Sequence, residues 1–264
     1  MRLTIYQIDA FANRAFEGNP AAVIPLEAWL SDDVMQSIAE ENNLAETAFF
    51  VAVEQGFEIR WFTPVTEVKL CGHATLASAY VIFNIIGYAS DNIEFESPSG
   101  KLSVARNNEI LTLNFPSYMP VKCEIPELLV KGLGLDKMAI QPQACMQSDD
   151  YIVVVENEEQ VAAINPELHF LKQIDLRGVI VTSPSKSYDF VCRFFAPKYG
   201  IPEDPVTGSA FTQLIPYWSE QLGKTQLTAK QISSRGGEVL CELTGDRVLI
   251  SGQAVKYLEG YIQI

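Results

Sequence analysis

Arg60-Trp61-Phe62-Thr63-Pro64 and Arg193-Phe194-Phe195-Ala196-Pro197 are two versions of one short motif, and this repetition decides the fold of the 264-residue chain. Each version predicts a strand that ends in a loop. Each loop leads to a sequence of small residues that opens an apolar segment, Gly72-His73-Ala74 in the first half and Gly208-Ser209-Ala210 in the second. The chain repeats one plan of strand, loop and helix, and we therefore expect two similar halves.

The spacing of glycines and serines supports this duplication. Gly72 and Gly208 are 136 residues apart, and the same spacing separates Gly87 from Gly223, Ser97 from Ser233 and Gly100 from Gly236. Pro64 and Pro197 are 133 residues apart, so the loop that enters the second helix is three residues longer. An insertion of this kind is best tolerated in a loop.

The two central segments predict buried helices. Apolar side chains surround most of the segment 72–87, which is typical of a helix enclosed by the rest of a protein. The segment 208–223 contains Pro216, which we expect to bend the helix or to remove one of its hydrogen bonds. Stretches punctuated by turns predict strands at 92–96, 101–106, 110–115, 151–155, 178–182, 238–243 and 247–251.

These elements predict an α+β protein in which each half is a curved β-sheet wrapped around one central helix. Peripheral helices are expected at 31–41, with Ser31 as the N-cap, and at 158–164. Two prolines, Pro116 and Pro120, close the first run of strands. We therefore expect domains at 1–117 and 118–264, with the last strand able to pack back on the first domain.

The composition excludes several classes of function. A net charge of −14 at pH 7 would repel a nucleic acid backbone and an anionic membrane surface. The first residues lack the apolar run of a signal peptide, so a cytoplasmic protein is expected. The five cysteines show no C-x-x-C spacing, which predicts neither a metal site nor a disulfide framework.

Four motifs carry a family resemblance. They are Gly18-Asn19-Pro20-Ala21-Ala22-Val23, Asn43-Leu44-Ala45-Glu46-Thr47-Ala48-Phe49, Leu70-Cys71-Gly72-His73-Ala74-Thr75 and Glu203-Asp204-Pro205-Val206-Thr207-Gly208-Ser209-Ala210. In the order and spacing of these motifs the chain resembles the PhzF family, the phenazine-biosynthesis-like proteins that share the diaminopimelate epimerase fold. The resemblance covers nearly the whole chain. It implies two pseudo-symmetric domains with the active site in the cleft between them, a homodimer and no cofactor.

The resemblance also implies roles for individual residues. Glu46 corresponds to the family's proton-shuttling glutamate, and the residues that correspond to substrate contacts are His73, Asp204 and Ser209. Gly72 and Gly208 would lie where backbone N–H groups at the two helix starts face the ligand. Such helix starts carry partial positive charge and bind carboxylates.

The expected function is an isomerase that acts on a small carboxylated metabolite by general acid–base catalysis. Glu46 would remove a proton from carbon and return it. At the spacing of 136 the counterpart of Glu46 is Thr182, so one carboxylate would serve both steps. In related two-thiol epimerases one cysteine precedes each central helix. Cys71 fits the first such position and Pro205 takes the second, which favours an isomerase over an epimerase.

Alternative interpretations stay open at this point. Cys71 is either a passive small residue or a reactive thiol with a pKa lowered by the helix start, which would give a thiol-dependent epimerase or racemase. A metabolite-binding protein without turnover is a further alternative. Structural roles are also available: an exposed strand residue for Glu46, a capping or core histidine for His73, a turn for Asp204 and a helix-start residue for Ser209. Asn19-Pro20 predicts a turn without chemistry.

Overall fold

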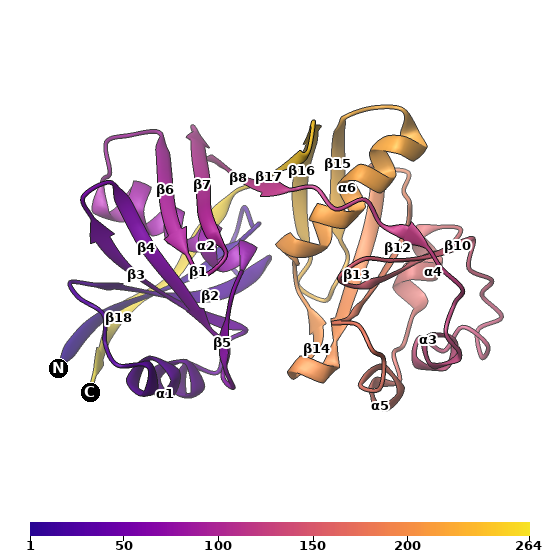
Figure 1. The fold of residues 1–264 in the computed structure, drawn as a ribbon, viewed down its shortest axis with the longest axis horizontal. Coiled ribbons are helices and arrows are strands. Elements are labelled where there is room, and N and C mark those ends of the chain that lie inside the picture. Colours follow the sequence, from indigo (N-terminus) through magenta and orange to yellow (C-terminus); the bar gives the residue numbers. More distant parts are fainter. The chain divides into compact units, whose positions relative to one another are not determined.

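The computed structural model describes residues 1–264, which form two compact units (Figure 1). The first unit contains Met1–Phe115 and Leu249–Ile264, and the second contains Pro116–Val248. The division expected from the sequence placed 118–264 in the second half. In the structure the last residues pack with the first unit, because β18 (Ala254–Gln263) pairs antiparallel with β1 (Arg2–Ala10). None of the helices has the length and apolar character needed to cross a membrane.

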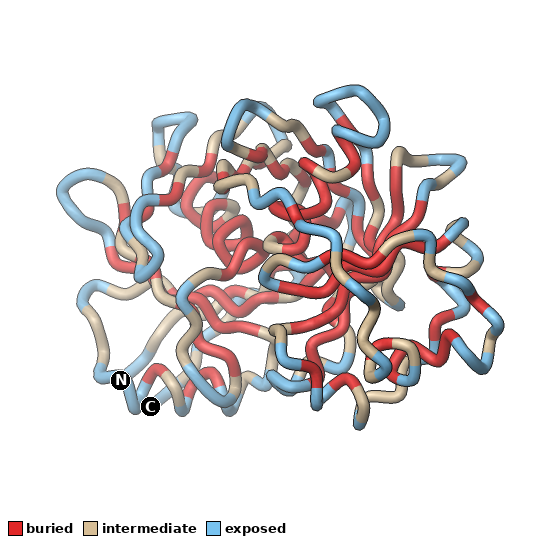
Figure 2. The backbone as a smooth tube through the Cα atoms, turned by 45° about the vertical axis from the view of Figure 1, so that its right-hand side comes forward, coloured by how far each residue is buried: buried red, intermediate tan, exposed pale blue.

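The first unit encloses helix α2 (Gly72–Tyr80). Every residue of 72–79 is buried, and Figure 2 shows the buried backbone gathered in the interior with exposed positions at the turns. The other elements of this unit are β2 (Asn19–Leu26), α1 (Asp32–Asn42), β3 (Glu46–Val53), β4 (Gly56–Phe62), β5 (Glu67–Val68), β6 (Asn92–Ser97), β7 (Gly100–Asn107) and β8 (Ile110–Pro116). Helix α2 continues directly into a π-helical segment, Val81–Ile86, which ends at Gly87 in the left-handed region.

The second unit encloses helix α6 (Gly208–Leu222). Its other elements are β9 (Val121–Lys122), α3 (Glu127–Gly132), β10 (Ala144–Gln147), β11 (Tyr151–Val154), α4 (Glu158–Ala163), α5 (Leu168–Leu171), β12 (Val179–Pro184), β13 (Phe190–Ala196), a 3-10 turn (Pro197–Tyr199), β14 (Ile201–Asp204), β15 (Gln226–Gln231) and β16 (Gly237–Thr244). β17 (Arg247–Gly252) crosses the boundary between the units.

The strand pairing of the two units confirms the internal duplication. In the first unit β2 and β3 are parallel, β3 and β4 antiparallel, β4 and β6 parallel, and β6 and β7 antiparallel. In the second unit β11 and β12, β12 and β13, β13 and β15, and β15 and β16 repeat this order. The central helix follows the third of these strands in both units, and a glycine in the left-handed region ends each helical segment.

Pro216 lies within α6, yet the helix continues without a break from Gly208 to Leu222. Proline has no N–H to donate to the carbonyl four residues earlier, which belongs to Thr212. The backbone N–H of Tyr118 donates to that carbonyl at 2.9 Å. The hydrogen bond that the proline removes is therefore replaced from outside the helix.

The strand register corrects one of the matches made at the spacing of 136. Phe62 and Phe195 are equivalent, and they pair with Thr47 and Val179 respectively. The counterpart of Glu46, one residue before Thr47, is therefore Gly178. The hairpins that join β3 to β4 and β12 to β13 differ in length, and this difference changes the spacing.

Thr182, the counterpart expected from the sequence, belongs to the core. Its side chain is fully buried, donates to the carbonyl of Val191 at 2.7 Å and accepts a hydrogen bond from the indole of Trp218 at 3.1 Å. The actual counterpart, Gly178, has no room for a side chain. A Cβ there would lie 2.6 Å from the carbonyl oxygen of Phe195.

A pair of arginine–carboxylate forks repeats with the fold. The guanidinium of Arg60 donates two hydrogen bonds to Glu67 (2.7 and 2.8 Å), and that of Arg193 donates two to Glu203 (2.7 and 2.9 Å). Each guanidinium also lies over the ring of a phenylalanine of its own strand, at 5.2 Å from the Phe62 centroid and 4.9 Å from the Phe195 centroid. The arginine that opens each motif thus ties the central strand to the short strand that follows it, β5 in the first unit and β14 in the second.

We expect Arg60→Lys and Arg193→Lys each to lower the free energy of unfolding by about 1–2 kcal/mol, because lysine keeps the charge but lacks the planar fork. Urea unfolding measures the change. Arg14→Lys is the control, since the Arg14 side chain is 77% exposed and its ion pair with Glu17 is on the surface. Equal stability of the three variants and the wild type would show that the forks do not stabilise the fold.

Candidate active site

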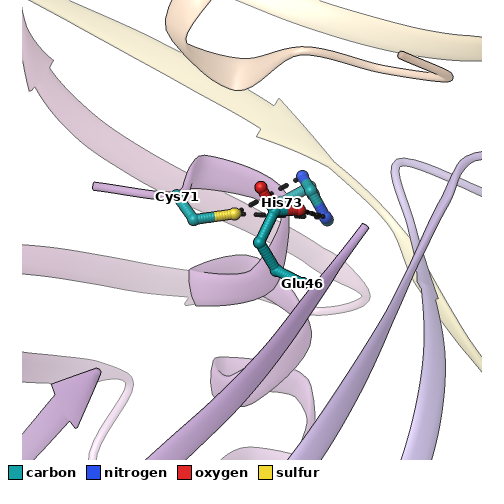
Figure 3. Close-up of side chains that lie close together, drawn as sticks. All are labelled: Glu46, Cys71 and His73. Atoms are coloured by element: carbon teal, nitrogen blue, oxygen red, sulfur yellow. Dashed lines mark hydrogen bonds and ion pairs between the residues drawn. The ribbon is translucent and has the colours of Figure 1, made fainter. Parts of the chain in front are cut away.

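Glu46 and His73 form a buried contact at the start of helix α2. Oε2 of Glu46 lies 3.1 Å from Nε2 of His73, and the two residues are 8% and 3% exposed (Figure 3). Glu46 is the first residue of β3 and His73 the second residue of α2, so the parallel pairing of β2 with β3 brings the carboxylate to the helix start. The interpretation of Glu46 as an exposed strand residue is wrong.

Asn19 holds the other side of the imidazole. Its side-chain amide nitrogen lies 3.1 Å from Nδ1 of His73, and Asn19 is fully buried. An amide carries a donor on one side and an acceptor on the other, so this contact suits a neutral or a protonated ring. Asn19 opens β2 and is not the turn that the sequence predicted. Gly18 before it has a φ of +67°, and a side chain there would collide with the carbonyl of Ala10.

Cys71 completes the cluster in Figure 3. It is the N-cap of α2, and its Sγ lies 3.6 Å from Nδ1 and 4.0 Å from Nε2 of His73. Burial, followed by the charge of Glu46, raises the pKa of the Cys71 thiol to about 11, and His73 offsets this only in part. The direction is opposite to the lowering expected from a helix start, so the thiol is protonated at neutral pH.

The pKa of His73 is raised well above its ordinary value of 6.5. Burial lowers the pKa, but charge interactions and hydrogen bonds with Cys71 and Glu46 raise it by more than burial lowers it. Since the Cys71 thiol is uncharged at neutral pH, we attribute the raised pKa there to the carboxylate of Glu46. The pair is then an imidazolium held against a carboxylate.

The same three side chains could hold a metal ion. Their ligand atoms all lie within 4.8 Å of one another, and sulfur, imidazole nitrogen and carboxylate oxygen are the ligand types that zinc takes in proteins. The sequence predicted no metal here because it lacks C-x-x-C spacing. The distances fit a three-ligand zinc site as well as a proton-transfer pair, in which Oε2 of Glu46 lies 3.1 Å from Nε2 of His73.

In the second unit, Asp204 lies at the end of β14, before the start of α6, and is 6% exposed. Its Oδ2 accepts a hydrogen bond from the hydroxyl of Thr207 at 2.5 Å. The buried side chain of Gln231 accepts from the Thr207 N–H at 2.9 Å and donates to the Asp204 carbonyl at 2.6 Å. This network fixes the turn 204–207, and Gln231 was not singled out by the sequence.

The N-cap of α6 is Thr207, the residue 136 positions after Cys71. The expectation that Pro205 matches Cys71 is therefore wrong. The three extra residues of the second unit lie between Pro197 and the N-cap Thr207, so the spacing is already 136 at the N-cap. Threonine also supplies no thiol, so the second unit offers no sulfur at this position. The Thr207 hydroxyl binds Asp204 and makes no capping hydrogen bond to the helix.

Ser209, the second residue of α6, binds a residue that the sequence did not single out. Its Oγ accepts a hydrogen bond from Nη1 of Arg177 at 2.9 Å, and Arg177 forms a fork with Asp150. The hydroxyl of Ser209 therefore does not satisfy a backbone donor. The available sequence signal was the position of Arg177, which stands directly before Gly178 as Ala45 stands directly before Glu46.

Each unit thus gathers its predicted residues at the start of its central helix. Glu46, Cys71, Gly72 and His73 meet in the first unit, and Asp204, Gly208 and Ser209 in the second. The sequence missed Asn19 in the first unit, and Asp150, Arg177 and Gln231 in the second. These are polar residues whose partners lie far away along the chain.

Comparison with known proteins shows close relatives. A family model described as PhzC-PhzF, phenazine biosynthesis-like protein, matches residues 8–260. Proteins named uncharacterized isomerases from Pseudomonas aeruginosa and Halalkalibacterium halodurans are 48% and 44% identical, and the alignments cover 100% and 98% of this chain and 100% and 97% of theirs. A crystal structure of an Enterococcus faecalis phenazine biosynthesis protein of the PhzF family superposes with a TM-score of 0.95 at 45% identity, over 100% of both chains. The predicted family resemblance and α+β fold are confirmed.

The raised pKa of His73 can be measured by NMR, because the chain has only two histidines and a His169→Gln variant assigns the signals. We expect the His73 imidazole to stay protonated well above pH 6.5. Glu46→Gln should lower the pKa of His73, because burial lowers it and the charge of Glu46 no longer raises it. Since the folded-state pKa exceeds the unfolded one, the contact stabilises the fold fully below about pH 6.5, and this stabilisation is lost as the pH rises through the folded value. A His73 pKa at or below 6.5 in the wild type would contradict the ion pair.

Proposed function

The chain belongs to the PhzC-PhzF family of phenazine biosynthesis-like proteins, and on this premise we propose that it is a cofactor-independent isomerase that moves a proton within a small carboxylated metabolite. Its relatives named as isomerases support the class of reaction. The observation that carries the proposal is the buried contact between Glu46 and His73 at the start of α2. A carboxylate in this position has a partner that can hold a positive charge throughout the reaction.

Glu46 is the base in the proposed mechanism. It accepts a proton from a C–H group of the substrate, and the electron pair of that bond shifts into the neighbouring unsaturated system. Glu46 then returns the proton to a different carbon, so a double bond moves and no electrons enter or leave the substrate. His73, as an imidazolium, stabilises the electron-rich intermediate.

Substrate contacts are assigned to the residues at the helix starts. Gly72 and Gly208 leave backbone N–H groups without a side chain in the way, and such groups bind carboxylates. His73, Asp204 and Ser209 would fix the substrate's polar groups. Asp204 is held rigid by Thr207, which favours a positioning contact with a donor group of the substrate.

A homodimer is part of the proposal. The last strand, β18, exposes Tyr257 (49%), Leu258 (43%) and Tyr261 (63%), which is an apolar set suited to contact with a second copy of the chain. Light scattering at increasing concentration tests this part separately. A cytoplasmic location is likewise proposed from the reduced cysteines.

The thiol-dependent alternative is disfavoured by the structure. A cysteine that removes a proton from carbon must be a thiolate, whereas burial raises the pKa of the Cys71 thiol to about 11. The equivalent N-cap in the second unit is Thr207, which cannot return a proton as a thiol would. Cys71 is then a small neutral residue that lines the Glu46–His73 contact.

Exchange in heavy water tests the proposed isomerase. A panel of small unsaturated carboxylates incubated with the protein should include one that acquires deuterium at carbon, detected by mass spectrometry. Glu46→Gln should lower the exchange rate by about 10²-fold or more, because an amide cannot accept the proton. Cys71→Ala should retain most of the rate.

Glu58→Gln is a matched control, since Glu58 lies on β4 of the same unit and bonds the indole of Trp29. It should exchange at the wild-type rate. If Cys71→Ala abolishes exchange while Glu46→Gln preserves it, the thiol mechanism replaces this one. Saturable binding of carboxylates without any exchange would support a metabolite-binding protein.

A further inference from the structure

Arg177 makes a three-part contact within the second unit. Nε and Nη2 donate to the two oxygens of Asp150, at 2.9 and 2.5 Å, and Nη1 donates to Oγ of Ser209 at 2.9 Å. The guanidinium also lies 5.3 Å from the centroid of the Phe194 ring. Its plane and direction are therefore fixed from several sides.

Asp150 is fully buried, which is costly for a carboxylate unless its oxygens are satisfied. Besides the fork with Arg177, its Oδ2 accepts from the side-chain amide of Gln213 at 2.7 Å, and its backbone N–H donates to the same amide at 3.3 Å. Gln213 comes from α6, the helix that carries Ser209. Asp150 thus sets the guanidinium relative to that helix start.

Arg193, in the same unit, forms a fork that has only structural partners. It donates two hydrogen bonds to Glu203, as Arg177 does to Asp150, but its Nη1 donates to backbone carbonyls at the end of α4, including that of Ile164 at 2.7 Å. The Arg193 side chain is 12% exposed, whereas that of Arg177 is 35% exposed. Arg177 therefore combines a fixed guanidinium with access from solvent.

The duplication relates Arg177 and Ser209 to the candidate site of the first unit. Ser209 is the second residue of α6, as His73 is of α2, and Arg177 stands directly before Gly178, the counterpart of Glu46. The first unit therefore directs the carboxylate of Glu46 at its helix start, and the second unit directs the guanidinium of Arg177 there from one position earlier.

We propose that Arg177 and Ser209 form a carboxylate-binding subsite, with Asp150 as the residue that positions the guanidinium. The inference rests on the proposed function, which requires a carboxylated substrate, and it names the residues that hold that group. No covalent step is involved.

The hydrogen bonding shows why the pair suits an anion. Three of the five N–H groups of Arg177 are used by Asp150 and Ser209, so two remain for a ligand. Because Oγ of Ser209 accepts from Arg177, its own O–H can donate to a ligand. Both groups can donate to the two charged oxygens of a carboxylate, whereas a neutral amide offers one uncharged acceptor oxygen. The carboxyls of Asp149 and Asp204 also lie close enough to act on the charge of Arg177.

Equilibrium binding tests the subsite, with acetate, benzoate and 2-aminobenzoate as probes and benzamide as the neutral isostere of benzoate. Calorimetric titration of the whole protein should show saturable binding of at least one carboxylate and weaker binding of benzamide. Arg177→Lys should raise the Kd of that carboxylate about ten-fold, because lysine cannot bond Asp150, Ser209 and a ligand in one plane. Asp150→Asn should raise it in the same direction.

Two further variants separate binding from folding. Arg193→Lys should lower the unfolding midpoint and leave the Kd unchanged. Ser209→Ala removes only one oxygen. It should raise the Kd by a smaller factor in an Arg177→Lys background than in the wild type, because the two side chains bind the same ligand and their effects are coupled. If Arg177→Lys fails to fold, Ser209→Ala alone decides, and an unchanged Kd in it overturns the subsite.

The outcome is independent of the isomerase assay. Carboxylate binding that depends on Arg177 without deuterium exchange would keep the subsite and reject the isomerase. Exchange together with an unchanged Kd in Arg177→Lys would keep the isomerase and reject the subsite. The absence of saturable binding of all three carboxylates by the wild type also rejects the subsite.

Discussion

Enclosing a helix inside a curved sheet buries its first turn, and this constraint governs the rest of the structure. The N–H groups of a first turn have no partners within the helix, so polar groups must gather there inside an otherwise apolar shell. In the first unit Glu46, His73 and Asn19 meet at the start of α2, and in the second Asp204, Thr207 and Gln231 surround the start of α6. The candidate site residues therefore lie where the architecture buries a helix start.

Duplication then allowed one backbone to carry two different sets of charges. The strand order, the forks of Arg60 and Arg193 and the left-handed glycines after the helices are common to both units, because they maintain the fold. The side chains at the helix starts are not. An imidazole in one unit corresponds to a hydroxyl in the other, and Gly178 leaves no room for a second copy of Glu46. Symmetry was kept where packing requires it and lost where ligands would bind.

The sequence predicted the features that depend on local pattern and repetition. The two glycine-initiated helices, the strands after them and the motif residues all follow from spacing, and the structure confirms their places. The sequence alone could not predict which side chains become partners, because those contacts depend on how the strands pair. The spacing of 136 holds along the two central helices but not in the strands before and after them, and so Thr182 was matched to Glu46 in place of Gly178. Arg177 and Asp150 are ordinary charged residues until β11 and β12 pair and bring them together.

In the proposed reaction, a protonated His73, as its raised pKa implies, decides how the charge of its pair with Glu46 changes during proton transfer. With an imidazolium beside it, the carboxylate of Glu46 belongs to a pair with no net charge, which does not repel an anionic substrate. When Glu46 takes the proton, the pair becomes positive at the moment the substrate gains an electron pair, and the two charges attract in a buried site where water screens them weakly. A neutral His73 would leave the pair uncharged at that moment. Burial of the ring against Glu46, at 3.1 Å, is therefore what couples the fold to the proposed reaction.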